Sequence, residues 1–226
     1  MGPVRVLVVA AMRSEMKAFL QRHRSGDREG DADVATGLLG IGTTLARAAT
    51  ERLIDESAPD HVLVVGVAGG IGPTTAIGDL VVPEVVLDGA TGAEHRPASI
   101  DGFTNRGTLH TSDELIVEPP RIAALVDRGV VALDMETAAV ASVCEHRGIP
   151  WSVLRGISDH ADAELIDPAI LGLMGPEGEA RPGAVARYVA THPHRLAHLA
   201  RLSKGLNAAT AASSDAAVQA LTRLSA

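Results

Sequence analysis

The sequence predicts an α/β protein with a largely parallel sheet, and three observations lead to that prediction. Apolar runs typical of strands alternate along the chain with segments of helical periodicity, the pattern of strand–helix–strand units. The runs are rich in Val and Leu and do not alternate cleanly with polar residues, as expected for strands covered on both faces. Aromatic residues make up only 2% of the chain and apolar residues 46%, so Val, Leu, Ile and Ala must build the core.

The regular elements are predicted in order from these patterns. The second helix shows the spacing well, with Leu45, Ala49 and Leu53 on one face. Gly148 directly follows the third helix, where a glycine commonly ends one. Strands are predicted at 4–10, 61–67, 129–134 and 151–157, and helices at 14–23, 43–58 and 136–148.

Other segments give weaker patterns. Residues 78–90 predict a strand in which Pro83 marks an edge or a bulge, and 108–117 predicts another strand. Polar loops are expected at 22–33 and 175–183. We predict one domain over 1–226, with a helical C-terminal segment from about 163 that is interrupted near Ser213 and Ser214.

Charge and cysteine content exclude several classes of protein. The net charge of −8 and the scattered basic residues argue against a nucleic-acid-binding surface. Cys144 is the only cysteine, which rules out an internal disulfide and fits a reducing compartment. The first apolar run is short and charged residues follow at once, unlike a signal peptide or a membrane span. We therefore expect a cytoplasmic protein without a membrane span.

A metal site is not expected. His194 and His198 are one helical turn apart, but the chain has no HExxH pattern and no obvious third ligand.

Polar residues follow each predicted long strand. Glu15, Glu136 and Asp159 come after three different strands, and Arg155 lies near the end of the last. The carboxyl ends of parallel strands share one edge of a sheet, where ligands bind, so these side chains are expected to converge. Carboxylates that share a partly dry pocket have shifted pKa values and can supply an acid and a base, as glycosidic bond cleavage requires. Each carboxylate alone also fits a helix cap or a solvated charge.

The glycine-rich segment 65–72, VGVAGGIG, leaves two interpretations open. It lacks the Lys-Ser/Thr of a Walker loop and meets the dinucleotide pattern G-x-G-x-x-G only loosely. It fits a phosphate cradle or a tight turn in which backbone approaches backbone.

Four segments carry a resemblance to a known family. They read, in chain order, VVAAMRSEM, GIGTTLA, GVAGGIGPTTAIGDLVVPEVV and ALDMETAAVASVCEHRGIPWSVLRGISDHAD. Together they resemble the purine nucleoside phosphorylase / nucleosidase superfamily, and within it the methylthioadenosine/S-adenosylhomocysteine nucleosidases, over residues 4 to about 162. The resemblance implies a three-layer α/β/α sandwich around a mixed, largely parallel sheet, usually assembled as a homodimer or a higher homo-oligomer.

The resemblance also implies roles for the polar residues. Asp159 resembles the acid that protonates purine N7, and Ser158 the residue that holds it. Glu15 resembles the residue that orients the attacking water, and Arg155 helps to place water and carboxylates. No metal or organic cofactor is implied. The positions that resemble substrate-binding residues are Ser158, Met135, Glu136, Leu115, Ile116, Val67, Ala68 and Gly69.

The sequence departs from the nucleosidase pattern at several places. Val67 replaces a common Ser or Thr, Leu115 replaces an aromatic residue, and the stretch between 117 and 129 is short. The segment after Asp162 looks more like the hopanoid-associated phosphorylase branch. Phosphorylases of the superfamily use arginines near the first strand and before the glycine segment, where this chain has only Arg13 near the first loop.

The predicted function is hydrolysis of the N-glycosidic bond of an adenosine-type purine nucleoside, such as methylthioadenosine or S-adenosylhomocysteine. Two alternatives stay open. One is a purine nucleoside phosphorylase with phosphate as co-substrate, and the other is a nucleoside-binding protein without catalysis. The expected partner is a small purine nucleoside in each case.

Overall fold

The structure places the predicted strands in one sheet with helices around it. The computed structural model describes residues 3–24, 33–160, 175, 181–192 and 196–225. Within these residues, nine strands join in a single sheet. In chain order the elements are β1 (Arg5–Ala10), α1 (Arg13–Arg24), β2 (Asp33–Leu38), α2 (Thr43–Ser57), β3 (His61–Gly70), β4 (Leu80–Val81), β5 (Val85–Asp88), β6 (Glu94–His95), β7 (Thr108–Thr111), α3 (Pro119–Val126), β8 (Val130–Asp134), α4 (Thr137–Arg147), β9 (Trp151–His160), α6 (Pro182–Thr191) and α7 (Leu196–Leu224).

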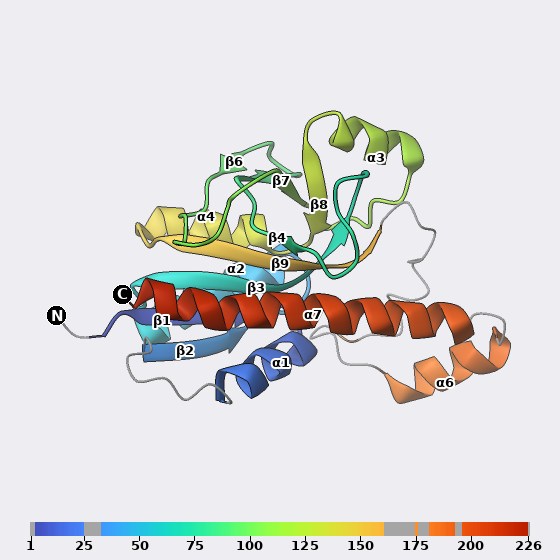
Figure 1. Ribbon diagram of the computed structural model, residues 1–226, viewed down its shortest axis with the longest axis horizontal. Coiled ribbons are helices and arrows are strands. Elements are labelled where there is room, and N and C mark those ends of the chain that lie inside the picture. The colour runs from blue at the N-terminus through green and yellow to red at the C-terminus, as the bar shows by residue number, and fades with distance from the viewer. Residues whose placement is uncertain (1–2, 25–32, 161–174, 176–180, 193–195, 226) are drawn as a thin grey trace.

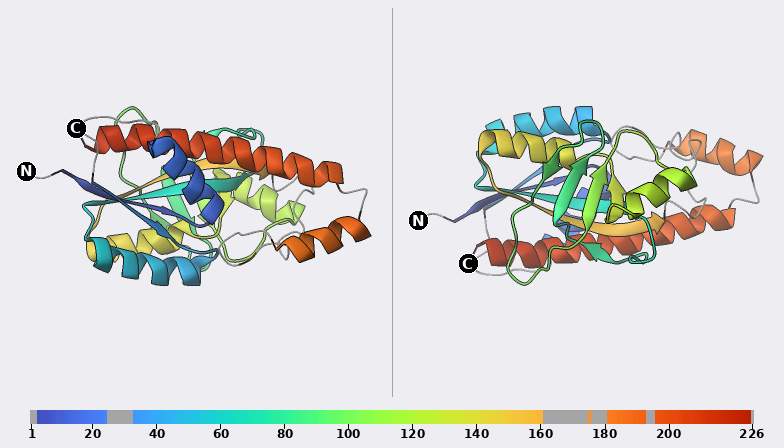
Figure 2. Two further views of the ribbon diagram at one scale, coloured as in Figure 1. Left: turned by 90° about the horizontal axis from the view of Figure 1, so that it is seen from below. Right: turned by 90° about the horizontal axis from the view of Figure 1, so that it is seen from above.

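Helices cover both faces of the sheet and make three layers (Figures 1 and 2). α1 and α7 lie on one face, and α2 and α4 lie on the other. Side chains of β1 alternate between the two cores: Leu7 and Val9 pack in the cluster that contains α2 and α4, whereas Val6 and Val8 pack in the cluster that contains α1 and α7. Because every long strand is covered twice, its sequence is almost wholly apolar. The predicted three-layer sandwich is confirmed.

The sheet is mixed and mostly parallel. Its strand order is β2-β1-β3-β8-β7-β5-β6, and β9 pairs with β3 and β4. β8 runs antiparallel to β3, with Gly69 opposite Leu133 and Gly70 opposite Ala132. The same strand runs parallel to β7, so the contact of β8 with β3 is one of those that make the sheet mixed, as the resemblance implied. The carboxyl ends of β3 and β8 still meet, because only the last residues of β3 pair with β8.

β3 and β9 continue further than the apolar runs indicated. β3 extends to Gly70 and β9 to His160, in parallel pairing. The register shifts between Ala68 and Gly69, so that Ser158 lies in a β-bulge between two regular pairs. A bulge turns the side chains that follow it. Ser158 and Asp159, which we expected beyond the strand, belong to β9.

Two weaker predictions are corrected by the structure. The segment 78–90 forms two strands, since β4 pairs with β9 and β5 pairs with β7. Pro83 stands between them, because a residue without an N–H ends the pairing. In the segment 108–117, only the four residues of β7 are a strand.

The C-terminal segment ends in one long helix. α7 continues through Ser213 and Ser214, so the predicted interruption is wrong. Both serines are buried, and the Ser213 hydroxyl donates to the carbonyl of Thr210 within the helix. The start of this segment near 163 and most residues of the loops predicted at 22–33 and 175–183 lie outside the described residues. No described helix is long and apolar enough to cross a membrane.

Candidate active site

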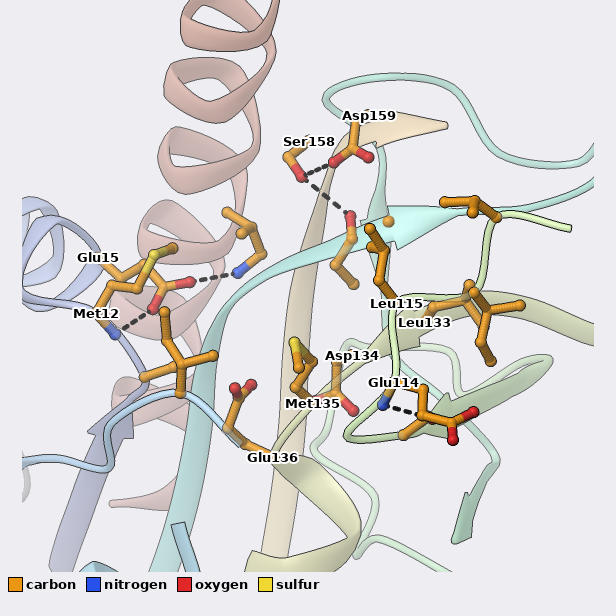
Figure 3. Close-up of a pocket in the computed structure, with 18 residues that line it drawn as sticks. Met12, Glu15, Glu114, Leu115, Leu133, Asp134, Met135, Glu136, Ser158 and Asp159 are labelled. Atoms are coloured by element: carbon orange, nitrogen blue, oxygen red, sulfur yellow. Dashed lines mark hydrogen bonds between the residues drawn. The ribbon is translucent and has the colours of Figure 1, made fainter. Parts of the chain in front are cut away.

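A cavity lies at the carboxyl ends of β3, β8 and β9 (Figure 3). Every site residue predicted from the sequence lines it, with the exception of Arg155. Glu15, Glu136 and Asp159 come from α1, the start of α4 and the end of β9, and they share this one cavity. The lining residues are Ala11, Met12, Glu15, Ile41, Val67, Ala68, Gly69, Ser112, Glu114, Leu115, Ile116, Val117, Leu133, Asp134, Met135, Glu136, Ser158 and Asp159.

Glu15 is fixed by backbone groups in the first turn of α1. Its carboxylate accepts the N–H groups of Met12 and Val67, each at 2.8 Å. Burial raises the pKa of Glu15, although Arg155 and the backbone donors oppose that shift. Gly66 has a φ of 142°, and a Cβ there would come within 2.4 Å of the Glu15 carboxylate. At Gly66 the glycine segment is part of β3 and not a turn, and the missing side chain leaves room for this carboxylate.

Arg155 lies behind the cavity wall and is fully buried. Its Nη2 donates to Asp134 Oδ2 at 2.6 Å, to Glu136 Oε2 at 3.4 Å and to Thr137 Oγ1 at 3.0 Å. Burial by itself would lower the pKa of Arg155, but Asp134, Glu136 and Glu15 raise it. Arg155 is therefore a permanent cation that acts on the cavity through its carboxylate partners and not by direct contact.

Asp134 is a site residue that our sequence reasoning missed. It accepts the Thr111 hydroxyl at 2.6 Å and the Thr137 N–H at 3.1 Å, so it also caps the first turn of α4. The Thr137 hydroxyl donates to it as well. The signal that could have revealed it is the same one that identified Glu15 and Asp159, a carboxylate at the end of an apolar run.

Glu136 directs its carboxylate toward the cavity from the start of α4 (Figure 3). Its Oε1 accepts the Gly42 N–H at 3.1 Å. Burial raises the pKa of Glu136 to about 8; Arg155 opposes this shift and Asp134 adds to it. Burial therefore favours the neutral form of Glu136 and Arg155 favours its carboxylate, and each of its oxygens accepts a hydrogen bond.

Asp159 and Ser158 form a pair on the far side of the cavity (Figure 3). Ser158 Oγ lies 2.5 Å from Asp159 Oδ1 and 3.4 Å from the carbonyl oxygen of Ala68. Burial raises the pKa of Asp159, while the Ser158 hydroxyl and His160 lower it. The net shift keeps a proton on this carboxyl at a higher pH than on an exposed aspartate.

The segment after β7 forms an apolar wall of the cavity. Leu115, Ile116 and Val117 line it, and the Glu114 N–H donates to Ser112 Oγ at 3.1 Å in the turn before them. Leu115 stands where we expected an aromatic residue from the resemblance, so the wall offers aliphatic contact and no ring to stack on a base.

The cavity is lined by acidic groups on an apolar surface. Within the described residues, each ionisable side chain that lines it is a carboxylate: Glu15, Glu114, Asp134, Glu136 and Asp159. Arg13 lines a different groove, on the outer side of α1. A neutral ligand suits this lining, whereas an anion would be repelled.

Metal binding was tested on the same part of the chain. The described residues contain no group of three or more His, Cys, Asp or Glu side chains that could hold a metal ion. The side chains of His194 and His198 lie outside them.

Comparison of the sequence with known proteins identifies its family. The model of the phosphorylase superfamily matches residues 5–106 and 98–190. A 5'-methylthioadenosine/S-adenosylhomocysteine nucleosidase of Shewanella putrefaciens is 32% identical over 160 residues, which cover 58% of this chain and 69% of that protein. The Bacillus pumilus protein of the same name is 28% identical over 203 residues, 71% of this chain and 88% of its own.

Solved structures share the fold. The nucleosidase of Neisseria meningitidis in complex with methylthio-immucillin-A has a TM-score of 0.71 at 20% identity and covers 96% of this chain and 98% of its own. Futalosine hydrolase of Helicobacter pylori has a TM-score of 0.68 at 18% identity and covers 94% of each chain. The chain belongs to the phosphorylase superfamily and is an enzyme of its nucleosidase or phosphorylase type.

Proposed function

We propose that this enzyme hydrolyses the N-glycosidic bond of adenosine-type purine nucleosides, with methylthioadenosine and S-adenosylhomocysteine as candidate substrates. The observation that carries the proposal is the meeting of Glu15, Glu136 and Asp159 around one cavity. The names of the Shewanella and Bacillus relatives support the choice of substrate.

Asp159 is the proposed general acid. Its raised pKa keeps it protonated at a pH where an exposed aspartate is ionised. Donation of that proton to purine N7 makes the base leave as a neutral molecule when the bond from C1′ to N9 breaks. The Ser158 hydroxyl holds the carboxyl in position.

The sugar is the proposed ligand of Met135 and Glu136. Both line the cavity next to β3, so the Glu136 carboxyl can exchange hydrogen bonds with ribose hydroxyls. Positive charge that develops at C1′ is stabilised by the acidic lining, which is already in place before the reaction.

Water is the proposed nucleophile, and Glu15 the group that orients it. Two backbone N–H groups fix the Glu15 carboxylate, and its raised pKa makes it a better proton acceptor than an exposed glutamate. Water attacks C1′ and passes its proton to Glu15. Arg155, through Asp134 and Glu136, keeps the carboxylates in their relative positions.

Hydrolysis is favoured over phosphorolysis by the charge of the site. A phosphate ion would need a cation beside C1′, but among the described residues the cavity lining has only carboxylates as ionisable groups.

The test compares three nucleosides in two buffers. The protein is incubated with methylthioadenosine, adenosine and inosine, with and without phosphate, and the free base is measured by chromatography. Base release without phosphate supports hydrolysis, and release only with phosphate identifies a phosphorylase. Binding without release of any base would instead identify a nucleoside-binding protein.

We further propose that the enzyme acts in the cytoplasm as a homodimer or a higher homo-oligomer and needs no metal or organic cofactor. These proposals rest on the family resemblance, and light scattering after gel filtration tests the oligomeric state.

A further inference from the structure

Asp113 connects two walls of the cavity that are far apart in the sequence. Its Oδ1 accepts the Thr43 N–H at 2.7 Å, and its Oδ2 accepts the Thr43 hydroxyl at 2.5 Å. Thr43 is the first residue of α2, and Asp113 lies in the loop after β7. These two bonds bridge 70 residues of chain.

α2 depends on this contact because it has no cap of its own. Its N-cap position is Gly42, which makes no side-chain hydrogen bond and has a φ of 97°. A residue with a side chain would be strained at that φ, and its Cβ would lie 3.3 Å from Asp113 Oδ1. Asp113 supplies the missing acceptor and also places a negative charge at the positive end of the helix.

The same turn holds a carboxyl of the candidate active site. The N–H of Gly42, next to Thr43, donates to Glu136 Oε1 at 3.1 Å. Ile41, one residue earlier, lines the cavity. On the other side of the contact, Glu114 and the apolar wall follow Asp113 directly. A shift of this contact would therefore move both the sugar side and the opposite wall of the cavity.

We propose that Asp113 is a positioning residue that fixes Glu136 through the turn at Gly42. It does not line the cavity itself. This inference rests on the proposed function to the extent that Glu136 binds the sugar. Interactions that hold substrate and transition state alike appear in KM, so loss of Asp113 raises KM more than it lowers kcat.

The test is Asp113→Ala, with Asp88→Ala as its matched control. Asp88 also accepts one threonine hydroxyl at 2.8 Å and a backbone N–H at 2.8 Å, but its donors are Thr91 and Ala90, which do not adjoin a group that holds Glu136. Asp113→Ala is expected to raise KM for methylthioadenosine about fivefold to tenfold, the effect of one lost cap interaction, and to change kcat less. Asp113→Asn keeps one acceptor oxygen and should restore part of the loss, whereas Asp88→Ala should leave KM unchanged.

A double-mutant cycle separates positioning from general loss of structure. If Asp113 acts through Glu136, Asp113→Ala adds little to the KM of a Glu136→Ala variant, which has no side-chain acceptor left for the Gly42 N–H. Additive effects of the two changes on KM would overturn the inference, as would equal KM values for the Asp113→Ala and Asp88→Ala variants.

Binding of methylthio-immucillin-A, measured by calorimetry, distinguishes failure of this inference from failure of the proposed function. Weaker binding by Asp113→Ala than by Asp88→Ala supports the positioning role even if the wild-type protein releases no base. A wild-type protein that releases base, with equal analogue binding by both variants, overturns the positioning role alone. A wild-type protein that neither binds the analogue nor releases base overturns both.

Discussion

Glu15 and Asp159 line the same cavity, and burial is the main cause of the raised pKa of each. Two backbone N–H groups and the nearby charge of Arg155 favour the ionised form of Glu15, the form that the proposed water-orienting role needs. Asp159 has one hydroxyl donor and is mainly shifted by burial, which suits a group that must give a proton. Two carboxyl groups in one site with different hydrogen-bond donors can serve as acid and base.

Replacement of the proposed acid should affect chemistry more than binding. Asp159→Asn cannot donate the proton, so kcat for methylthioadenosine should fall by about 10²–10⁴. Ser158→Ala, which only loosens the carboxyl, should lower kcat less. Adenine release measured by absorbance checks both, and an Asp159→Asn variant with the kcat of the wild type would show that another group protonates the base.

Glu136 should leave a signature in the pH dependence of stability. Its pKa is about 8 in the folded protein and near 4.5 when exposed, so its neutral form favours the folded state. The stabilisation of the folded state by neutral Glu136 is fully present below about pH 4.5 and is lost as the pH rises through about 8. Glu136→Gln stays neutral throughout. Urea unfolding at pH 5 and at pH 8 should therefore show the variant gaining stability relative to the wild type at the higher pH.

The wild type and the Glu136→Gln variant share all other titrating groups. The contributions of those groups therefore cancel in the difference between the two unfolding free energies. Glu15, also with a raised pKa, and His61, whose burial lowers its pKa to about 4, are present in both. A difference in unfolding free energy that is the same at both pH values would mean that Glu136 is ionised in the folded protein.

Among the elements, α7 determines where the end of β9 lies. A Cβ at Gly205 of α7 would come 2.1 Å from the Ser158 carbonyl oxygen, and a Cβ at Gly156 of β9 would come 2.1 Å from the Ala209 carbonyl oxygen. The backbones of α7 and β9 are thus in direct contact at Ser158, whose hydroxyl donates to the Asp159 carboxyl. Only glycine allows this approach.

Gly205→Ala should therefore lower stability and activity together. Overpacking at this contact is expected to cost about 1–3 kcal/mol of unfolding free energy and to reduce kcat, because Ser158 must move. Gly183→Ala in α6 is the control, since a Cβ there meets nothing within 4 Å. Urea unfolding and initial rates check the prediction, which would be contradicted by equal behaviour of the two variants.

The sequence predicts elements well where they are long and covered on both sides. β1, α1, α2, β8 and α4 agree with prediction within a few residues. β2 was missed because it is a half-exposed edge strand with little apolar character. α3 was missed because it is short and begins at a proline, which reads as a loop in sequence. α6 lies within the predicted helical C-terminal segment, although its own bounds were not predicted. The end of β9 was missed because Ser158 and Asp159 are polar residues within a strand.

At the scale of the whole molecule, sequence indicated that the site residues meet but not how. The residues of an apolar run do not show whether the strand lies parallel or antiparallel to its neighbour. The antiparallel contact of β8 with β3 could therefore not be predicted. Convergence of Glu15, Glu136 and Asp159 followed from their places at strand ends, and the structure brings them to one cavity. Asp134 escaped notice because its ion pair is with Arg155, 21 positions away. Asp113 belongs to a segment that resembles a purine-binding one, but its contact with Thr43, 70 positions away, could not be predicted from sequence.

The charge of the molecule predicts its response to phosphate and to chelators. With a net charge of −8 and an acidic cavity, phosphate should not accelerate base release. Because the proposed reaction uses no metal, prior dialysis against EDTA should leave the rate unchanged. Rates in phosphate and in a zwitterionic buffer, before and after dialysis, check this. A rate that depends on phosphate would contradict hydrolysis, and a rate lost on dialysis and restored by a metal would contradict metal-free chemistry.

A crystal structure with methylthio-immucillin-A tests the central claim most directly. The account predicts that the analogue fills the cavity with its base within about 3 Å of the Asp159 carboxyl and its sugar-like ring in hydrogen-bond contact with Glu136. An analogue bound outside this cavity, or one whose base is turned away from Asp159, would contradict it.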